Sequence, residues 1–272
     1  MTSESAVYPV LPVAAPFRAP GQAQSARGSL GLALIHGFTG NPASLRPLAE
    51  GLNAQGFGVE LPRLPGHGTD PKDLQRTRYS DWRAEVERAV ERLAQSCKHV
   101  ALIGFSMGGT LALDVTSAGK QDFLGLVCIN PLVVDRKGPL VKLAPMLEKV
   151  MPMAPAALAG MRKDDIAKPG ASEHAYDWVP TASGNSLLRE LPRVREQARG
   201  LSCPLLVAHS RQDHTVPPEN SAALLALVPA AQELWLERSF HVAPLDYDAE
   251  LLVTSISAFF DRLLAQKSSK SR

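Results

Sequence analysis

Apolar runs alternate with amphipathic segments along most of this 272-residue chain, and this rhythm limits the fold more than any other feature. Short apolar runs that are typical of buried strands stand at residues 30–36, 57–61, 99–103, 124–129, 205–208 and 234–236. Segments of helical periodicity lie between or after them, at residues 41–56, 80–97, 109–115, 219–227 and 248–264. Strands that alternate with helices predict an α/β fold, in which a mostly parallel sheet carries helices on both faces.

The stretch from residue 131 to residue 191 interrupts this rhythm. It is rich in Met, Pro, Ala and Lys, and it shows helix-like patches but no clear strand. Because it follows a strand whose carboxyl end should face the active side of the sheet, we expect a lid over the site, with a plain surface insertion as the alternative. The expected organisation is an N-terminal extension (1–28), a core in two parts (29–130 and 192–266), a cap or lid insertion (131–191) and a flexible tail (267–272).

Composition argues against several classes of protein. The formal net charge is only +2, and no dense basic run is present, so we expect no nucleic-acid partner. None of the three cysteines has a metal-ligand spacing, so we expect no metal, and their odd number favours a reducing, cytoplasmic location. The first 20 residues lack a positive leading region and contain four prolines, and no segment is long and apolar enough to span a bilayer, so we expect no signal peptide or membrane anchor.

The pentapeptide Gly104-Phe-Ser-Met-Gly108 stands between an apolar strand and a helix. Glycines on either side of the serine allow a sharp, strained turn and close packing of the helix. A turn of this kind presents a serine hydroxyl to a substrate and to a base. We therefore expect Ser106 to be a nucleophile, and the alternative is an ordinary strand-to-helix turn with a buried serine.

The loop His36-Gly-Phe-Thr-Gly40 follows the first clear strand. In folds with this type of serine turn, such a loop supplies one backbone N–H to the oxyanion hole, and the residue after the nucleophile supplies the other. We expect these donors to be Phe38 and Met107. His36 is expected to be a structural histidine that fixes the loop rather than a catalytic group.

A carboxylate and a histidine follow the last two strands. Asp213 stands at a strand end, where a carboxylate can hold a histidine base in its correct tautomer, and Asp135 is the main alternative. His241 comes just after the last strand, and the chain order Ser106, Asp213, His241 is the order that this type of serine turn requires. We therefore expect these three residues to form a catalytic triad, with His214 as a bystander.

With these motifs, the sequence resembles the thermostable bacterial monoacylglycerol lipases and related carboxylesterases. The resemblance covers roughly residues 10–264 and is weakest from 131 to 170. It implies an α/β-hydrolase fold with a small cap insertion, an apolar acyl tunnel and no metal. The stretches that carry it are His36-Gly-Phe-Thr-Gly40, Ser44-Leu-Arg-Pro-Leu-Ala49, Leu61-Pro-Arg-Leu-Pro-Gly-His-Gly-Thr69, residues 104–110, Asp213-His-Thr-Val-Pro-Pro218 and Ser239-Phe-His-Val-Ala-Pro-Leu-Asp-Tyr247.

The resemblance also implies a substrate. In these lipases a cap glutamate shortly before an Ala-Tyr pair contacts the glycerol hydroxyls, and Glu173-His-Ala-Tyr176 matches that spacing, so Glu173 is the candidate, with a solvated surface charge as the alternative. The implied activity is hydrolysis of monoacylglycerols through an acyl-enzyme on Ser106, without a cofactor, on a small-molecule or lipid ester, with at most transient membrane or micelle contact through the cap. The alternatives are a general short- or medium-chain carboxylesterase, an acyltransferase and a non-catalytic ligand receptor. The sequence leaves the oligomeric state open.

Overall fold

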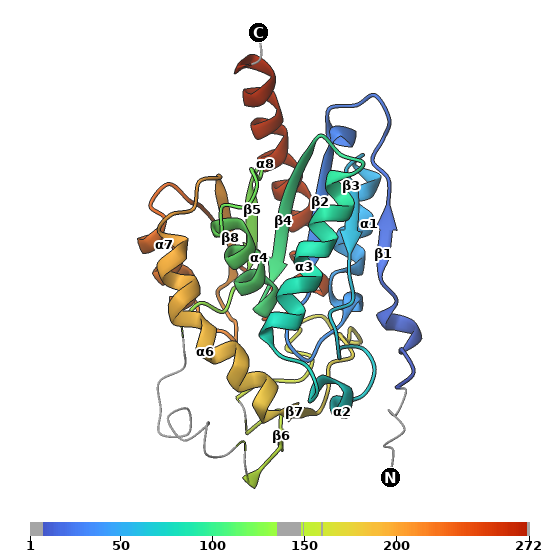
Figure 1. Ribbon diagram of the computed structural model, residues 1–272, viewed down its shortest axis with the longest axis vertical. Coiled ribbons are helices and arrows are strands. Elements are labelled where there is room, and N and C mark those ends of the chain that lie inside the picture. Colours follow the sequence, from blue (N-terminus) through green and yellow to red (C-terminus); the bar gives the residue numbers. More distant parts are fainter. Residues whose placement is uncertain (1–7, 135–147, 149, 159, 271–272) are drawn as a thin grey trace.

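A seven-stranded sheet forms the centre of the molecule (Figure 1), in a computed structural model that describes residues 8–134, 148, 150–158 and 160–270. The strand order is β1-β3-β2-β4-β5-β8-β9, and all neighbouring strands are parallel except β1, which pairs antiparallel with β3. All six predicted strands are present, and the predicted α/β fold is confirmed. The strands are β1 (Phe17–Ala19), β2 (Leu30–Ile35), β3 (Gly58–Leu61), β4 (His99–Phe105), β5 (Leu126–Ile129), β8 (Leu205–Ser210) and β9 (Gln232–Leu236).

Helices cover both faces of this sheet (Figure 1). The helices are α1 (Arg46–Ala54), α2 (Pro71–Leu74), α3 (Tyr79–Ala94), α4 (Met107–Ser117), α6 (Thr181–Ala198), α7 (Glu219–Leu227) and α8 (Ala249–Lys270). The described residues also form short 3-10 turns, at Pro12–Ala14, Arg27–Ser29, Pro42–Ser44 and Ala243–Leu245.

Alternate side chains of each central strand feed two separate hydrophobic cores. In β2, Ala33 and Ile35 pack with α3, α4, α6 and α7, whereas Leu32 and Leu34 pack with α1 and α8 on the other face. Every residue of β2 is buried, which explains why this strand reads as a continuous apolar run rather than as an alternation.

The described part of the insertion, defined here as residues 131–191, lies at the carboxyl ends of the parallel strands (Figure 1). This part contains the strands β6 (Met153–Pro155) and β7 (Trp178–Pro180), which pair antiparallel in a separate small sheet. The expectation of no strand here was therefore wrong, because each strand has only three residues and ends in proline, which leaves no alternation to detect. Helix α6 runs across the boundary that the sequence predicted at residue 191.

The N-terminal segment that the structure describes lies against the body of the protein. The Leu11 N–H donates to the Gly68 carbonyl at 2.8 Å, and Ala14 is fully buried. Strand β1 then adds to the edge of the sheet. This strand was not predicted, because three residues on a sheet edge bury too little apolar surface to leave a pattern.

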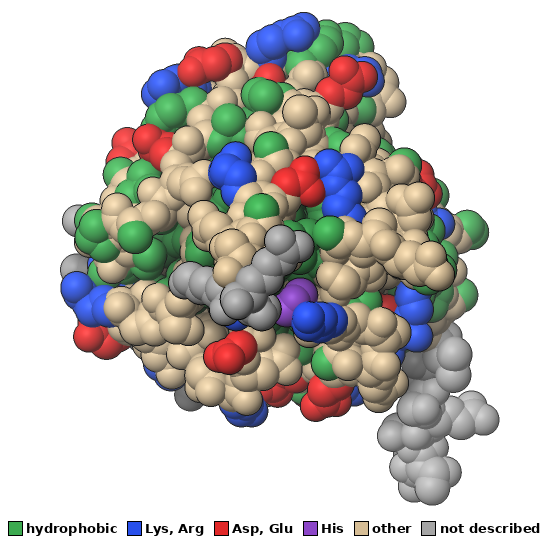
Figure 2. Space-filling model, turned by 90° about the horizontal axis from the view of Figure 1, so that it is seen from above, with side chains coloured by type: hydrophobic (Ala, Val, Ile, Leu, Met, Phe, Trp, Pro, Cys, Tyr) green, Lys and Arg blue, Asp and Glu red, His purple; other side chains and the backbone are tan. Residues whose placement is uncertain are grey.

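The face at which the parallel strands begin is shown in Figure 2, on the opposite side from the insertion. Lys and Arg side chains are interspersed there with Asp and Glu, and neither sign of charge gathers into a continuous patch. Among the described residues, no helix combines the length and the apolar character that a bilayer crossing requires.

Candidate active site

Ser106 occupies a strained turn between β4 and α4. Its backbone has φ 55° and ψ −120°, a conformation that residues with a side chain rarely adopt. Two glycines make room for the turn: a Cβ on Gly104 would lie 2.2 Å from the Gly108 carbonyl oxygen, and one on Gly108 would lie 2.0 Å from the Ile35 carbonyl oxygen. Only glycine fits at these two positions, so the pentapeptide forms the tight strand–turn–helix that its sequence predicts.

Ser106, His241 and Asp213 lie in one chain of hydrogen bonds. The Nε2 atom of His241 is 3.1 Å from Ser106 Oγ, and its Nδ1 atom is 2.7 Å from Asp213 Oδ2. The other carboxylate oxygen of Asp213 accepts the N–H groups of Thr215 and Val216 at 2.8 and 2.7 Å. The turns after β4, β8 and β9 thus bring together the three residues expected as a triad.

The charges within this hydrogen-bonded triad favour proton uptake by the His241 imidazole. Burial acts to raise the pKa of Asp213, but the charge of His241 and hydrogen bonds from His209, His241 and the Val216 N–H hold that pKa well below its usual range. Burial acts to lower the pKa of His241, yet the charge and hydrogen bond of Asp213, with smaller effects of Glu173 and Asp165, raise that pKa above its ordinary value. Both shifts describe a carboxylate that stabilises a protonated imidazole.

The loop from His36 to Gly40 lies directly beside the serine. A Cβ on Gly37 would be 3.3 Å from Ser106 Cβ. The Met107 N–H belongs to the first turn of α4, where a helix has no acceptors of its own for its amides. Within the part of the chain that the structure describes, neither this N–H nor that of Phe38 donates to a protein acceptor. The two predicted oxyanion donors, one directly after Ser106 and one in the neighbouring loop, therefore have no protein acceptor among the described residues.

His36 holds this loop in place. Its Nδ1 atom lies 2.9 Å from the Gly37 carbonyl, and its Nε2 atom accepts the Leu64 N–H at 3.1 Å. Burial lowers the pKa of His36 to about 4, so the ring stays neutral and keeps both contacts. This geometry agrees with the structural role expected for it.

Glu173 lies within the site rather than on the surface. It is buried, and a Cβ on Gly40 would be 3.3 Å from its Oε2 atom. The Asn41 side chain donates to the Glu173 carbonyl oxygen at 3.1 Å, and Asp164 Oδ1 accepts the Glu173 N–H at 2.7 Å. Burial raises the pKa of Glu173 to about 7, opposed by the charge of His241. The alternative of a solvated surface charge does not fit this position.

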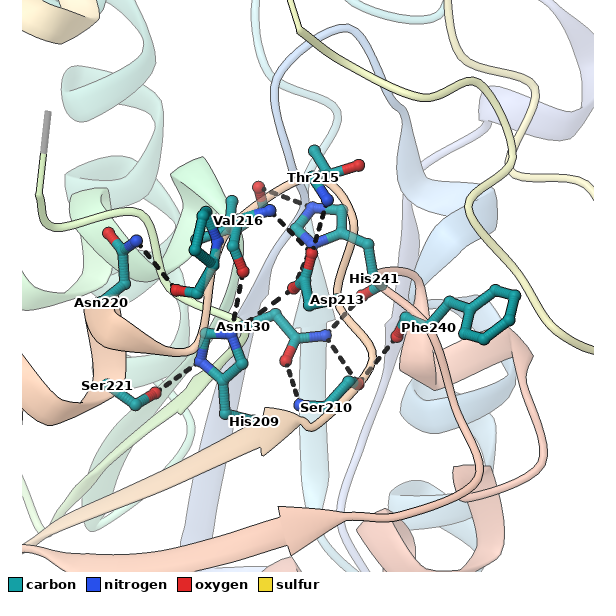
Figure 3. A network of polar contacts seen from close by, with 12 residues as sticks. Asn130, His209, Ser210, Asp213, Thr215, Val216, Asn220, Ser221, Phe240 and His241 are labelled. Carbon is teal, nitrogen blue, oxygen red and sulfur yellow. Dashed lines mark hydrogen bonds and ion pairs between the residues drawn. The ribbon is translucent and has the colours of Figure 1, made fainter. Parts of the chain in front are cut away.

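Sequence reasoning missed three polar side chains behind the triad: Asn130, His209 and Asp165. Asn130, fully buried with φ 45°, donates to the His241 carbonyl and accepts the Ser210 N–H (Figure 3). His209 Nε2 lies 3.5 Å from Asp213 Oδ2 (Figure 3). A polar residue directly after an apolar strand would have indicated Asn130, whereas His209 stands inside a strand and Asp165 in an irregular segment, where no pattern marks them.

Two further predictions concern aspartate and histidine neighbours. The His214 ring contacts Asp165, with its Nδ1 atom 2.8 Å from Asp165 Oδ1. Asp135, the alternative acid, lies outside the described residues. Among the residues that are described, no group of three His, Cys, Asp or Glu side chains is arranged to hold a metal ion.

Comparisons with known proteins place this site in a family. Residues 31–242 match the family described as serine aminopeptidase, S33. The chain is 36% identical, over 93% of its length and 96% of the relative's, to a thermostable monoacylglycerol lipase of Bacillus sp. (strain H-257). It is 28% identical, over 87% of its length and 94% of the relative's, to a carboxylesterase of Bacillus subtilis (strain 168).

A solved structure agrees with these sequence matches. It is described among the metagenome-derived lipolytic enzymes LipS and LipT, and it superposes with a TM-score of 0.85 at 32% identity over 93% of this chain and all of the other. The family description names a peptidase, whereas the proteins that match along nearly the whole chain are named as lipases and esterases. The chain belongs to this α/β-hydrolase family, and within it to the carboxylic ester hydrolases.

Proposed function

We propose that this protein is a monoacylglycerol lipase, which releases a fatty acid and glycerol through an acyl-enzyme on Ser106. The observation that carries the proposal is the hydrogen-bonded chain from Ser106 through His241 to Asp213, with the serine on a strained turn beside unused backbone donors. This arrangement matches the needs of ester cleavage, in which a hydroxyl must be deprotonated as it attacks.

The proposed reaction has two halves. In the first, His241 takes the proton of Ser106 as its oxygen attacks the ester carbonyl, and the oxyanion accepts hydrogen bonds from the N–H groups of Phe38 and Met107. The bond to the alcohol then breaks as His241 returns the proton to the leaving oxygen. In the second half, His241 deprotonates water as the water attacks the acyl-enzyme. The bond between the acyl carbon and Ser106 Oγ then breaks, His241 returns its proton to Oγ, and the acid is released. Asp213 holds the imidazole and stabilises its protonated form.

Glu173 supports the choice of monoacylglycerol within the esters. A monoacylglycerol differs from a simple ester of the same acid by two free hydroxyls, which only a polar group near the leaving alcohol can recognise. Glu173 is buried against the loop that carries Phe38, so its carboxylate lies at the edge of the proposed oxyanion hole. The similarity to a monoacylglycerol lipase along nearly the whole chain supports the same choice.

The insertion supports a lipid ester as substrate and a role as a lid. Its described residues include four exposed large apolar side chains, Val150, Met151, Leu158 and Trp178, which would favour transient contact with a micelle or membrane. It also touches the oxyanion loop, because the Tyr176 N–H donates to the Thr39 carbonyl at 3.1 Å. The cytoplasmic location expected from the cysteines stays a prediction.

A rate comparison with a Ser106→Ala control tests the proposal. The purified protein is assayed on a monoacylglycerol, a triacylglycerol and an ethyl ester of the same acyl chain, so that the leaving alcohols have similar reactivity. We expect the highest kcat/KM on the monoacylglycerol, and a loss of about 10⁴- to 10⁶-fold in kcat for Ser106→Ala on every substrate. A fluorophosphonate probe should label the wild-type protein at Ser106 only. A preference for simple esters over monoacylglycerol would assign the protein as a general carboxylesterase, and a Ser106→Ala variant with near-wild-type turnover would remove the mechanism.

A further inference from the structure

We propose that Asp165, in the insertion, is a positioning residue that ties together the loops carrying Asp213 and His241. The inference rests on the proposed function, since it concerns how the same triad is held in place. It makes the insertion part of the support of the triad as well as a cover over the site.

The first set of contacts reaches the loop of Asp213. Asp165 is buried, and its side chain is 1% exposed. Its Oδ2 atom accepts the His214 N–H at 3.0 Å, and its Oδ1 atom lies 2.8 Å from the Nδ1 atom of the same histidine. The Thr215 hydroxyl is 3.5 Å from Oδ2. One carboxylate therefore contacts the two residues that directly follow Asp213.

The second set of contacts reaches the loop of His241. The same Oδ2 atom lies 3.4 Å from the His241 N–H, which it accepts at the long end of the hydrogen-bond range. The backbone carbonyl of Asp165 accepts the Val242 N–H at 3.0 Å. The segment around Asp165 thus binds the backbone on both sides of the His241 peptide.

These contacts call for a carboxylate, because every partner donates a hydrogen. The backbone N–H groups of His214 and His241 are donors, the Thr215 hydroxyl donates, and the His214 ring donates through its Nδ1–H. An asparagine would turn its NH₂ group toward one of these donors and leave a buried pair of donors face to face.

The neighbouring residue links the same segment to Glu173. Asp164 has φ 47°, and its Oδ1 atom accepts both the Ser172 hydroxyl at 3.0 Å and the Glu173 N–H at 2.7 Å. Two consecutive aspartates therefore contact two parts of the site: Asp164 binds the backbone of Glu173, and Asp165 binds the loops of the triad.

Asp165 also acts on His241 by its charge. The charged groups that face His241 are Asp213, Glu173 and Asp165, and each of them acts to raise the pKa of the imidazole. The base must be neutral to accept the proton of Ser106, so kcat/KM should rise with pH through a group titrating above 6.5. Removal of the charge at Asp165 should lower that pKa and extend activity to lower pH.

The test is the pH profile of kcat/KM for Asp165→Asn, measured with a p-nitrophenyl ester and expressed per fluorophosphonate-titrated site. We expect the acid limb to move to lower pH by about half a unit, and kcat at pH 8 to fall by up to about 100-fold because the triad loops shift. Asp165→Glu should restore the acid limb.

Asp246→Asn is the matched control. Asp246 is equally buried and also joins the insertion to the His241 loop, since its carboxylate accepts the N–H groups of Ala167, Lys168 and Phe240 at 2.7 to 3.0 Å. Its carboxylate accepts no hydrogen bond from the His241 N–H or from the two residues after Asp213. We expect this variant to lose thermal stability while its acid limb stays in place.

The outcomes separate the two proposals. An Asp165→Asn variant with an unmoved acid limb, or an equal shift in Asp246→Asn, would overturn the role of Asp165 while leaving ester hydrolysis intact. If the wild-type protein does not hydrolyse esters, or if Ser106→Ala hydrolyses them as fast, the proposed function itself fails. If Asp165→Asn does not fold, the pH profile of Asp165→Glu decides, because this variant keeps the charge while it moves the carboxylate. We then expect a lower kcat and an acid limb at the wild-type pH. A wild-type kcat would contradict the proposal.

Discussion

Glu173 lies so close to Gly40 that a methyl group on the glycine would stand 3.3 Å from the carboxylate oxygen Oε2. These residues belong to the insertion and to the loop that carries Phe38, and they are far apart in the sequence. The contact places an ionisable group beside the proposed oxyanion hole, where the alcohol part of an ester would leave.

Replacement of Glu173 by alanine should affect monoacylglycerols selectively. A charge-assisted hydrogen bond to a substrate hydroxyl contributes about 1.5 to 3 kcal/mol, which corresponds to roughly a 10- to 150-fold loss in kcat/KM. We expect little change for a p-nitrophenyl ester of equal chain length, which has no glycerol hydroxyls. The measurement is the ratio of kcat/KM for the two substrates in Glu173→Ala and in the wild type. Equal losses on both would mean that Glu173 merely supports the insertion.

Gly108→Ala should disable the serine turn. A Cβ at this position would lie 2.0 Å from a backbone oxygen, so β2 or the turn must move, and the Met107 N–H moves with it. Loss of one oxyanion donor alone costs about 10²- to 10³-fold in kcat. Gly200→Ala is the control, because its Cβ would meet its nearest neighbour at an ordinary 3.5 Å. A Gly108→Ala protein that turns over like the wild type would show that the turn is not the site.

Much of the core could be predicted from the sequence, because the patterns that mark its strands and its serine turn are local. Buried parallel strands give continuous apolar runs, and the serine pentapeptide needs its glycines for steric reasons that act within five residues. Ser106, Asp213 and His241 each follow a strand, and parallel strands bring their carboxyl ends to one edge of the sheet, so their meeting could be predicted from the topology.

The rest depends on contacts between distant segments. Nothing in the residues around Asp165 indicates that its carboxylate reaches the Asp213 loop, 49 residues away in sequence, because that contact arises only when the insertion folds onto the core. The strands β6 and β7 are defined by their pairing with each other. Each has only three residues, which is too few for a recognisable sequence pattern.

Asp213→Asn should reduce kcat by about 10⁴-fold, by analogy with serine proteases. The amide oxygen can keep the N–H groups of Thr215 and Val216, but its NH₂ group then faces His241 Nδ1 and favours the wrong tautomer. The measurement is kcat at pH 8 together with the melting temperature, which should change little if the loop is kept. Asp135→Asn is the comparison, and a larger loss in that variant would transfer the acid role to Asp135.

Glu173 should make the wild-type protein less stable at high pH than a variant without its charge. Burial raises its pKa from the ordinary 4.5 to about 7, so the folded protein binds this proton more tightly than the unfolded chain. The stabilisation by that proton is fully present below pH 4.5 and is lost as pH rises to 7. One pKa unit corresponds to about 1.4 kcal/mol, so the loss reaches about 3 kcal/mol.

Glu173→Gln cannot lose a proton, and it removes this dependence. We expect the free energy of unfolding of the variant to exceed that of the wild type by up to about 3 kcal/mol at pH 8, with a difference below about 1 kcal/mol at pH 5. Chemical denaturation at both pH values measures it, and the comparison between the two proteins cancels the titration of groups whose pKa does not depend on the charge of Glu173. A difference that is the same at pH 5 and pH 8 would mean that Glu173 is already ionised at pH 5 in the folded protein. A carboxylate that weakens the fold above neutral pH is then retained for its contact with substrate, so the gain in stability and the loss in monoacylglycerol turnover should appear in the same variant.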